Sequence, residues 1–129
     1  MANFEVLPDQ TVQPWLTFER HLTVLRGLWE HQPSTAYPEV SVPTLLIVAE
    51  TGEVNWTASK SDAACDAVAA LTTGRAHWFR PAHHDVHAQH PTLVAALLHD
   101  AVTAPDFFDT AYSHTDTDTG TLSNTEPPR

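Results

Sequence analysis

Large apolar residues recur at helical spacing in the first part of the chain. Between residues 14 and 34 they are separated by four, three and four positions: Phe18, Leu22, Leu25 and Trp29. This spacing places their side chains on one face of a helix. Pro14 suits the first turn of that helix. Pro33 ends it, because the residue before a proline avoids the helical conformation.

Two short apolar runs further along the chain predict strands. Residues 45–49 form a continuous apolar run after Pro43, and residues 75–82 carry the second run. The run at 45–49 is short and continuous rather than alternating, which is typical of a strand buried on both faces, as in a parallel sheet. We expect residues 75–82 to form a second short, buried strand.

The segments that follow these runs have helical patterns. Residues 57–74 are rich in alanine, with apolar residues at 64, 67, 68 and 71, and Gly74 is the kind of residue that ends a helix. Residues 91–102 begin with a proline and carry a second apolar face, which predicts the last helix.

The resulting order is helix, strand, helix, strand, helix, which predicts an α/β fold with a parallel sheet and right-handed crossovers. Two parallel strands do not make an independent sheet. We therefore interpret residues 14–104 as one end of a larger α/β domain. That interpretation leaves residues 45–49 and Trp78 poorly covered on at least one side.

The two ends of the chain lack these patterns. Residues 1–13 are polar without a clear period, so we expect an irregular N-terminus. Residues 105–129 are dominated by threonine, aspartate and serine, and we expect them to form a disordered acidic tail.

Charge and cysteine content exclude several functional classes. Sixteen acidic residues against six basic ones give a formal charge of −10, which argues against nucleic acid and anionic membranes as partners. The single cysteine, Cys65, cannot form an internal disulfide. No secretory signal pattern and no apolar run of about 18 residues is present, so we expect a cytoplasmic protein that does not span a membrane.

The segment with the richest chemistry is AHHDVHAQHP, residues 82–91. It carries an aspartate and four of the nine histidines of the chain: His83, His84, His87 and His90. A metal site is one interpretation, but the zincin arrangement needs a glutamate directly after its first histidine, and this stretch has none. Acid–base catalysis is the favoured interpretation, because the stretch follows a parallel strand and sites lie at the carboxyl ends of such strands.

At this point the sequence resembles the C-terminal end of α/β-hydrolase-fold proteins. The resemblance rests on the order of elements over residues 14–102 and on the match of AHHDVHAQHP to a small residue, His-x-x-His-x-x-x-Pro. It places His84 at the catalytic histidine, with His87 and Pro91 at the flanking positions. It implies a partial α/β-hydrolase-like sheet and serine-type hydrolysis of an ester, amide or C–C bond in a small molecule, without cofactor or metal.

The chain departs from this family at the nucleophile. No G-x-S-x-G occurs in the sequence, so we expect the chain to be inactive alone. The triad acid is Glu53, or Glu50 at the strand end, or a residue elsewhere if both are solvated loop charges. The alternatives are a non-catalytic α/β interaction module, which associates with a partner chain or a second copy through an exposed sheet edge, and a His-rich metal-binding protein.

Overall fold

The computed structural model describes residues 4–52 and 54–124. The chain divides into two compact units, with the boundary after Pro33. We describe each unit by itself. The helix that we grouped with the α/β segment therefore belongs to the first unit, and the segment that begins at residue 34 carries both predicted strands.

The first unit contains a short hairpin where the sequence predicted irregular chain. Strand β1 (Phe4–Val6) pairs antiparallel with β2 (Val12–Pro14). The turn closes through a 2.8 Å bond from the Leu7 amide to the Thr11 carbonyl. The prediction of an irregular N-terminus is wrong for these residues, because strands of three residues are too short to show a period.

Helix α1 (Phe18–Glu30) follows the hairpin and confirms the predicted helix with a later start. Pro14 ends β2, and Thr17 caps the helix by accepting a bond from the Arg20 amide at 3.4 Å. Threonine is a favoured N-cap because its hydroxyl satisfies an amide at the helix end. No residue of α1 is buried.

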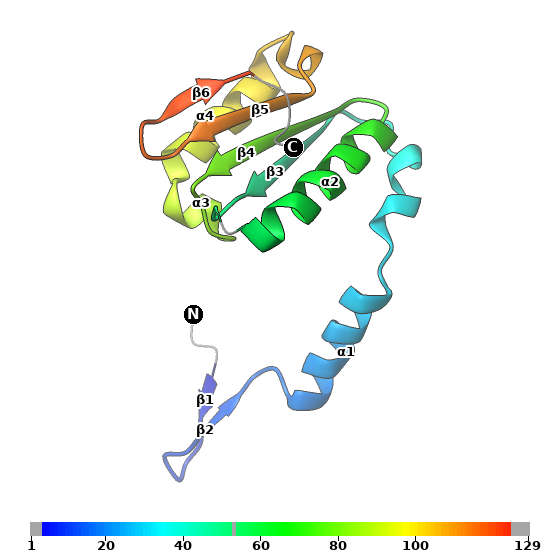
Figure 1. The fold of residues 1–129 in the computed structure, drawn as a ribbon. Coiled ribbons are helices and arrows are strands. Elements are labelled where there is room, and N and C mark those ends of the chain that lie inside the picture. Colours follow the sequence, from blue (N-terminus) through cyan, green and yellow to red (C-terminus); the bar gives the residue numbers. More distant parts are fainter. Residues whose placement is uncertain (1–3, 53, 125–129) are drawn as a thin grey trace. The chain divides into compact units, whose positions relative to one another are not determined.

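The second unit is built on a mixed four-stranded sheet in the order β3-β4-β5-β6 (Figure 1). Its strands are β3 (Thr44–Ala49), β4 (Gly74–Arg80), β5 (Tyr112–Asp116) and β6 (Thr121–Ser123). The first two pairs are parallel, with Thr44 opposite Gly74 and Ala76 opposite Tyr112, and β6 is antiparallel to β5. The α/β class and the two predicted strands are confirmed.

Helices cover both faces of this sheet (Figure 1). They are α2 (Val54–Ala70), α3 (Val86–Gln89) and α4 (Pro91–Thr103), with short 3₁₀ turns at Pro33–Thr35, Tyr37–Glu39 and Phe107–Asp109. Val68 of α2 packs with Trp78 on one face, and Leu97 of α4 packs with Phe79 on the other. The connection from β3 to β4 runs through α2, and the connection from β4 to β5 runs through α4. Both connections lead to the next strand in the same direction along the sheet, but they cross opposite faces of it. One of them is therefore left-handed, whereas crossovers between parallel strands are almost always right-handed.

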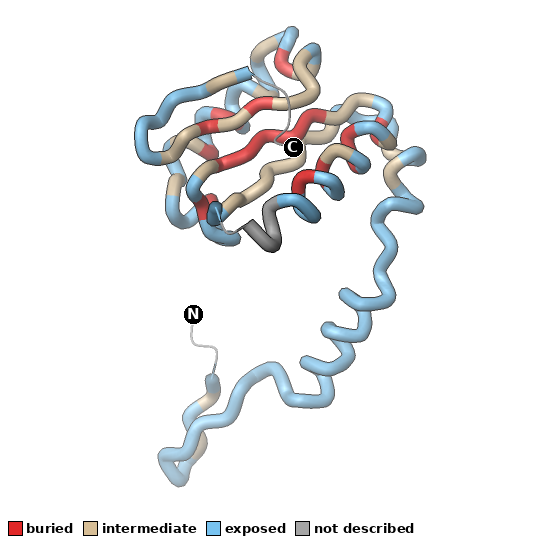
Figure 2. Tube along the Cα trace, in the orientation of Figure 1, coloured by how far each residue is buried: buried red, intermediate tan, exposed pale blue. Residues whose placement is uncertain are grey.

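The core lies on both sides of β4, whose inner residues are buried (Figure 2). Trp78 is 2 % exposed and Phe79 is fully buried. The expectation that Trp78 would be poorly covered is wrong, because α2 packs over that face and Tyr112 of β5 contacts the indole ring. Strand β3 lies at the edge of the sheet, and all of its residues are only half-buried.

The predicted disorder of residues 105–129 is wrong for the part that the structure describes. Phe107 is buried, and β5 and β6 complete the sheet. Ser113 and Thr115 alternate along β5 and are buried, because their hydroxyls bind buried side chains of β4. Residues 125–129 lie outside the described residues. Within the described ranges, the helices are too short or too polar to cross a membrane.

Candidate functional site

The carboxyl ends of three parallel strands meet at one edge of the sheet. Glu50 follows β3, Arg80 ends β4 and Asp116 ends β5. These residues line a cavity of about 380 Å³ together with four others: Gly52, Pro81, His114 and Asp118. Binding sites of open α/β sheets lie at this edge, but His84 is not among the residues that line this cavity, so the predicted site stays a prediction.

Glu50, one candidate for the triad acid, is held in place at this edge. Its carboxylate forms an ion pair with the Arg80 guanidinium, and the two side chains are only 15 % and 26 % exposed. Its backbone is fixed as well, because its amide binds the Phe79 carbonyl at 3.1 Å and its carbonyl accepts from the Ala82 amide at 2.7 Å. The Glu50 carboxylate is therefore oriented by Arg80.

His84 lies in the loop that connects β4 with α3. Ala82 is buried and anchors the loop, whereas His83, His84 and Asp85 are exposed. The His83 amide donates to the Gln89 side-chain oxygen at 2.7 Å, which closes the loop onto α3.

The structure gives a position relative to His84 for only one of the two candidate acids. Glu50 and His84 follow the carboxyl ends of adjacent parallel strands, β3 and β4. In the described part of the chain, no hydrogen bond or ion pair joins their side chains. Glu53, the other candidate acid, lies outside the described residues. The assignment of the acid therefore stays a prediction.

The other histidines of this stretch do not gather around one point. His83 and His90 line a separate cavity of about 260 Å³ with Gln89 and Asp118, and His87 is exposed on α3. Over residues 4–52 and 54–124, no three histidine, cysteine, aspartate or glutamate side chains lie close enough together to hold a metal ion. The metal-binding alternative therefore has no support from this arrangement.

A buried polar network between β4 and β5 was missed from the sequence. The His77 ring lies between two hydroxyls, with Nδ1 2.7 Å from Ser113 Oγ and Nε2 2.9 Å from Thr115 Oγ1. Arg75 Nη2 donates to the same Ser113 oxygen at 2.8 Å. The spacing of two positions puts Arg75 and His77 on one face of β4, and Ser113 and Thr115 on one face of β5. The register of the two strands, with His77 opposite Ser113, brings these faces together.

Burial makes His77 a neutral residue in the folded protein. Burial is the largest cause, and together with the charge of Arg75 and a smaller electrostatic effect of His114 it lowers the pKa of the imidazole from 6.5 to about 4. A neutral imidazole has one donor and one acceptor nitrogen. Each hydroxyl beside it can therefore make one bond, and protonation would leave two donors facing them.

We expect the stability of the second unit to fall as the pH falls from about 6.5 to about 4. Below 6.5 the unfolded chain binds a proton at His77 and the folded chain does not, so unfolding is favoured, by about 3 kcal/mol at the lower limit. Urea unfolding at pH 4, 5, 6 and 7 measures this loss. His77→Gln should flatten the dependence of the unfolding free energy on pH between pH 6.5 and 5, and His99→Gln on α4 should leave that dependence unchanged. Equal pH dependence in the unchanged protein and in both variants would contradict the assignment of the loss to His77.

Comparison with known proteins gives no relative for this chain. No protein-family model, no curated protein and no solved structure matches it. The resemblance to α/β-hydrolases therefore rests on the order of elements and on the histidine stretch of this sequence.

Proposed function

We propose that residues 34–104 form the acid- and histidine-bearing part of a serine-type hydrolase of the α/β-hydrolase kind. Its substrate is a small molecule with an ester, amide or C–C bond to be cleaved. One observation carries the proposal: adjacent parallel strands β3 and β4 end in Glu50 and in the His84 loop, and α4 begins at Pro91 directly after that loop. This order agrees with the arrangement that the histidine motif implies.

In the proposed reaction His84 is the proton carrier. It takes the proton of a serine hydroxyl and returns it to the leaving group, and a carboxylate orients the ring and stabilises its charged form. Glu53 and Glu50 are the candidates for that carboxylate. Glu50 can serve only if its ion pair with Arg80 opens or is shared with His84. This requirement favours Glu53.

The nucleophile must come from outside the printed sequence, because no G-x-S-x-G is present in it. Strand β3 offers the place where the rest of the sheet can join. In the described residues β3 pairs with β4 alone, and its side chains from Leu45 to Ala49 are apolar on both faces. A free edge of this kind accepts a further strand. We propose that this strand belongs to the part of the enzyme that carries the serine.

The genomic reading frame upstream of Met1 tests this proposal. We expect an in-frame G-x-S-x-G there, and we expect the extended chain to hydrolyse p-nitrophenyl esters and to be labelled by a fluorophosphonate. The 129-residue chain should do neither, because histidine and carboxylate without a nucleophile cannot form the acyl-enzyme. Absence of an upstream nucleophile, or hydrolysis by the 129-residue chain, would contradict the proposal.

A non-catalytic α/β interaction module is the second candidate. The observation in its favour is the half-buried ion pair of Glu50 with Arg80, which occupies the one described carboxylate of the predicted triad. In this case the β3 edge binds a partner chain and His84 has no proton to transfer. An extended chain without hydrolase activity, which still gains a partner strand along β3, would favour this function.

Location and other partners follow from composition in both cases. With an acidic balance of 16 to 6 and one cysteine, we place the protein in the cytoplasm and expect it to bind no nucleic acid.

A further inference from the structure

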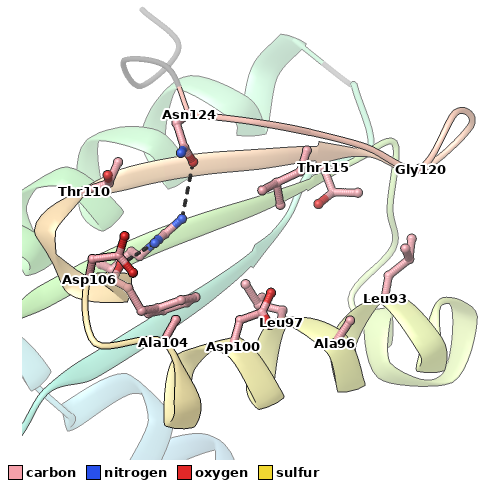
Figure 3. Close-up of a pocket in the computed structure, with 13 residues that line it drawn as sticks. Leu93, Ala96, Leu97, Asp100, Ala104, Asp106, Thr110, Thr115, Gly120 and Asn124 are labelled. Atoms are coloured by element: carbon pink, nitrogen blue, oxygen red, sulfur yellow. Dashed lines mark hydrogen bonds between the residues drawn. The ribbon is translucent and has the colours of Figure 1, made fainter.

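A third cavity lies between α4 and the strands β5 and β6 (Figure 3). Its volume is about 420 Å³, within the range of sites that hold small molecules. Apolar side chains form most of its wall: Leu93, Ala96, Leu97, Ala104, Phe107 and Leu122. The remaining wall carries charges and hydrogen-bonding groups, which is the composition of a ligand site rather than of a packing defect.

The positive charge of this cavity is Arg75, which is only 6 % exposed. Its Nε and Nη2 donate to Ser113 Oγ at 3.2 and 2.8 Å, and Nη1 donates to the Phe107 carbonyl. The last bond, from Nη2 to Asn124 Oδ1, is the longest at 3.4 Å. The guanidinium carbon lies 4.1 Å from the centre of the Phe107 ring. The Arg75 guanidinium is thus fixed. Its outer edge, where Nη2 bonds to Asn124, is held by the longest of these bonds.

Within the described residues, no carboxylate lies within ion-pair distance of Arg75. Burial lowers the pKa of its guanidinium, and the charge of Asp106 raises it in part. A buried charge without an opposite charge in contact is costly. A carboxylate that replaced Asn124 at the outer edge would form a charge-assisted bond in place of a long neutral one.

Two acids line the same cavity and limit what can bind there. Asp100 on α4 and Asp106 after it are both exposed, and both contribute to the cavity wall (Figure 3). Their charges repel a multiply charged anion. They favour a ligand that brings an ammonium group together with its carboxylate.

We propose that this cavity binds a small zwitterion with an apolar side chain, of the chemical class of leucine. Its carboxylate binds Arg75 Nη1 and Nη2 in place of Asn124, and its ammonium group binds Asp100 or Asp106. Its side chain packs on Leu93, Leu97 and Leu122. The inference is independent of hydrolysis, because none of these residues belongs to the edge that carries His84.

Leucine and two ligands that each lack one of its charged groups test the two charges separately. Calorimetric titration of the 129-residue chain with leucine should give a Kd at least about tenfold lower than with 4-methylpentanoate or 3-methylbutylamine, which lack the ammonium and the carboxylate respectively. Equal affinities for the three ligands, or no binding of leucine at millimolar concentration, would overturn the proposal.

Variants locate the binding in this cavity. The exposed pair Asp100→Asn with Asp106→Asn should remove the preference for leucine over 4-methylpentanoate, and Asp62→Asn on the exposed side of α2 should keep it. Arg75→Met should abolish binding of leucine in a chain whose circular dichroism is unchanged. If Arg75→Met does not fold, the aspartate pair decides: leucine binding with its preference intact in that variant would overturn the proposal.

Discussion

Replacing His84 with alanine is expected to lower kcat/KM of the hydrolase that we propose by about 10³-fold or more, because the proposed serine would lose its proton acceptor and the leaving group its proton donor. His84 is exposed in the loop after β4, so the change removes no buried contact. The unfolding free energy should therefore stay within about 0.5 kcal/mol of the unchanged protein. Steady-state ester hydrolysis and urea unfolding of the same preparations measure both quantities.

The neighbouring histidines give matched controls for this prediction. His83→Ala and His87→Ala alter exposed imidazoles of the same segment and should each lower kcat/KM by less than about tenfold. If His83→Ala or His87→Ala caused a loss as large as His84→Ala, the assignment of proton transfer to His84 would be wrong. Glu53→Gln and Glu50→Gln separate the two candidate acids in the same assay, since only the acid that orients His84 should cause a comparable loss.

The strands and helices around the site could be predicted from the sequence because their signals are local. The apolar run that begins at Leu45 and the run around Trp78 lie in β3 and β4, and α4 begins at Pro91 as predicted. Each signal depends on neighbouring residues alone: a continuous apolar run, or a proline at a helix start. The position of the His84 loop at the carboxyl end of β4 follows from the same signals.

The C-terminal strands were missed because their stability depends on residues far away in the sequence. Thr, Ser and Asp in residues 112–123 are typical of disordered chain when apolar content is counted. In the fold, Ser113 and Thr115 bind Arg75 and His77, which lie 38 residues away or nearly so. Amino-acid composition cannot show that a hydroxyl forms a hydrogen bond with a buried side chain of another strand. The handedness of the crossovers depends in the same way on where β5 joins the sheet.

The side-chain partners at the site could not be predicted from the sequence either. The sequence placed Glu50 and His84 after adjacent strands, and spacing alone suggests that they meet. Arg80, at the end of β4, forms an ion pair with the Glu50 carboxylate. A guanidinium beside a carboxylate forms a stronger and more directional pair than an exposed imidazole does. Which partner a carboxylate finds depends on side-chain direction at the ends of two strands, and one-dimensional spacing does not contain that direction.

Replacing Phe79 with alanine is expected to lower the unfolding free energy of the second unit by about 3–5 kcal/mol. Phe79, the last residue but one of β4, is fully buried. It packs with Leu97 and Phe107, and its ring centre lies 4.9 Å from that of His77. The change removes apolar contacts from both α4 and the 3₁₀ turn that carries Phe107. It also opens a cavity beside the buried polar network, whose hydrogen bonds depend on the ring packing that holds His77.

Urea unfolding at pH 7, followed by circular dichroism, measures this loss. Phe18→Ala on α1 is the matched control, because the Phe18 side chain is 76 % exposed and its removal should cost less than about 0.5 kcal/mol. A loss below about 1 kcal/mol for Phe79→Ala would mean that β4 does not form the centre of the core. The core between β4 and α4 holds β4, and with it the start of the His84 loop, in place. In the extended enzyme that we propose, the same variant should therefore lower the temperature at which ester hydrolysis is lost.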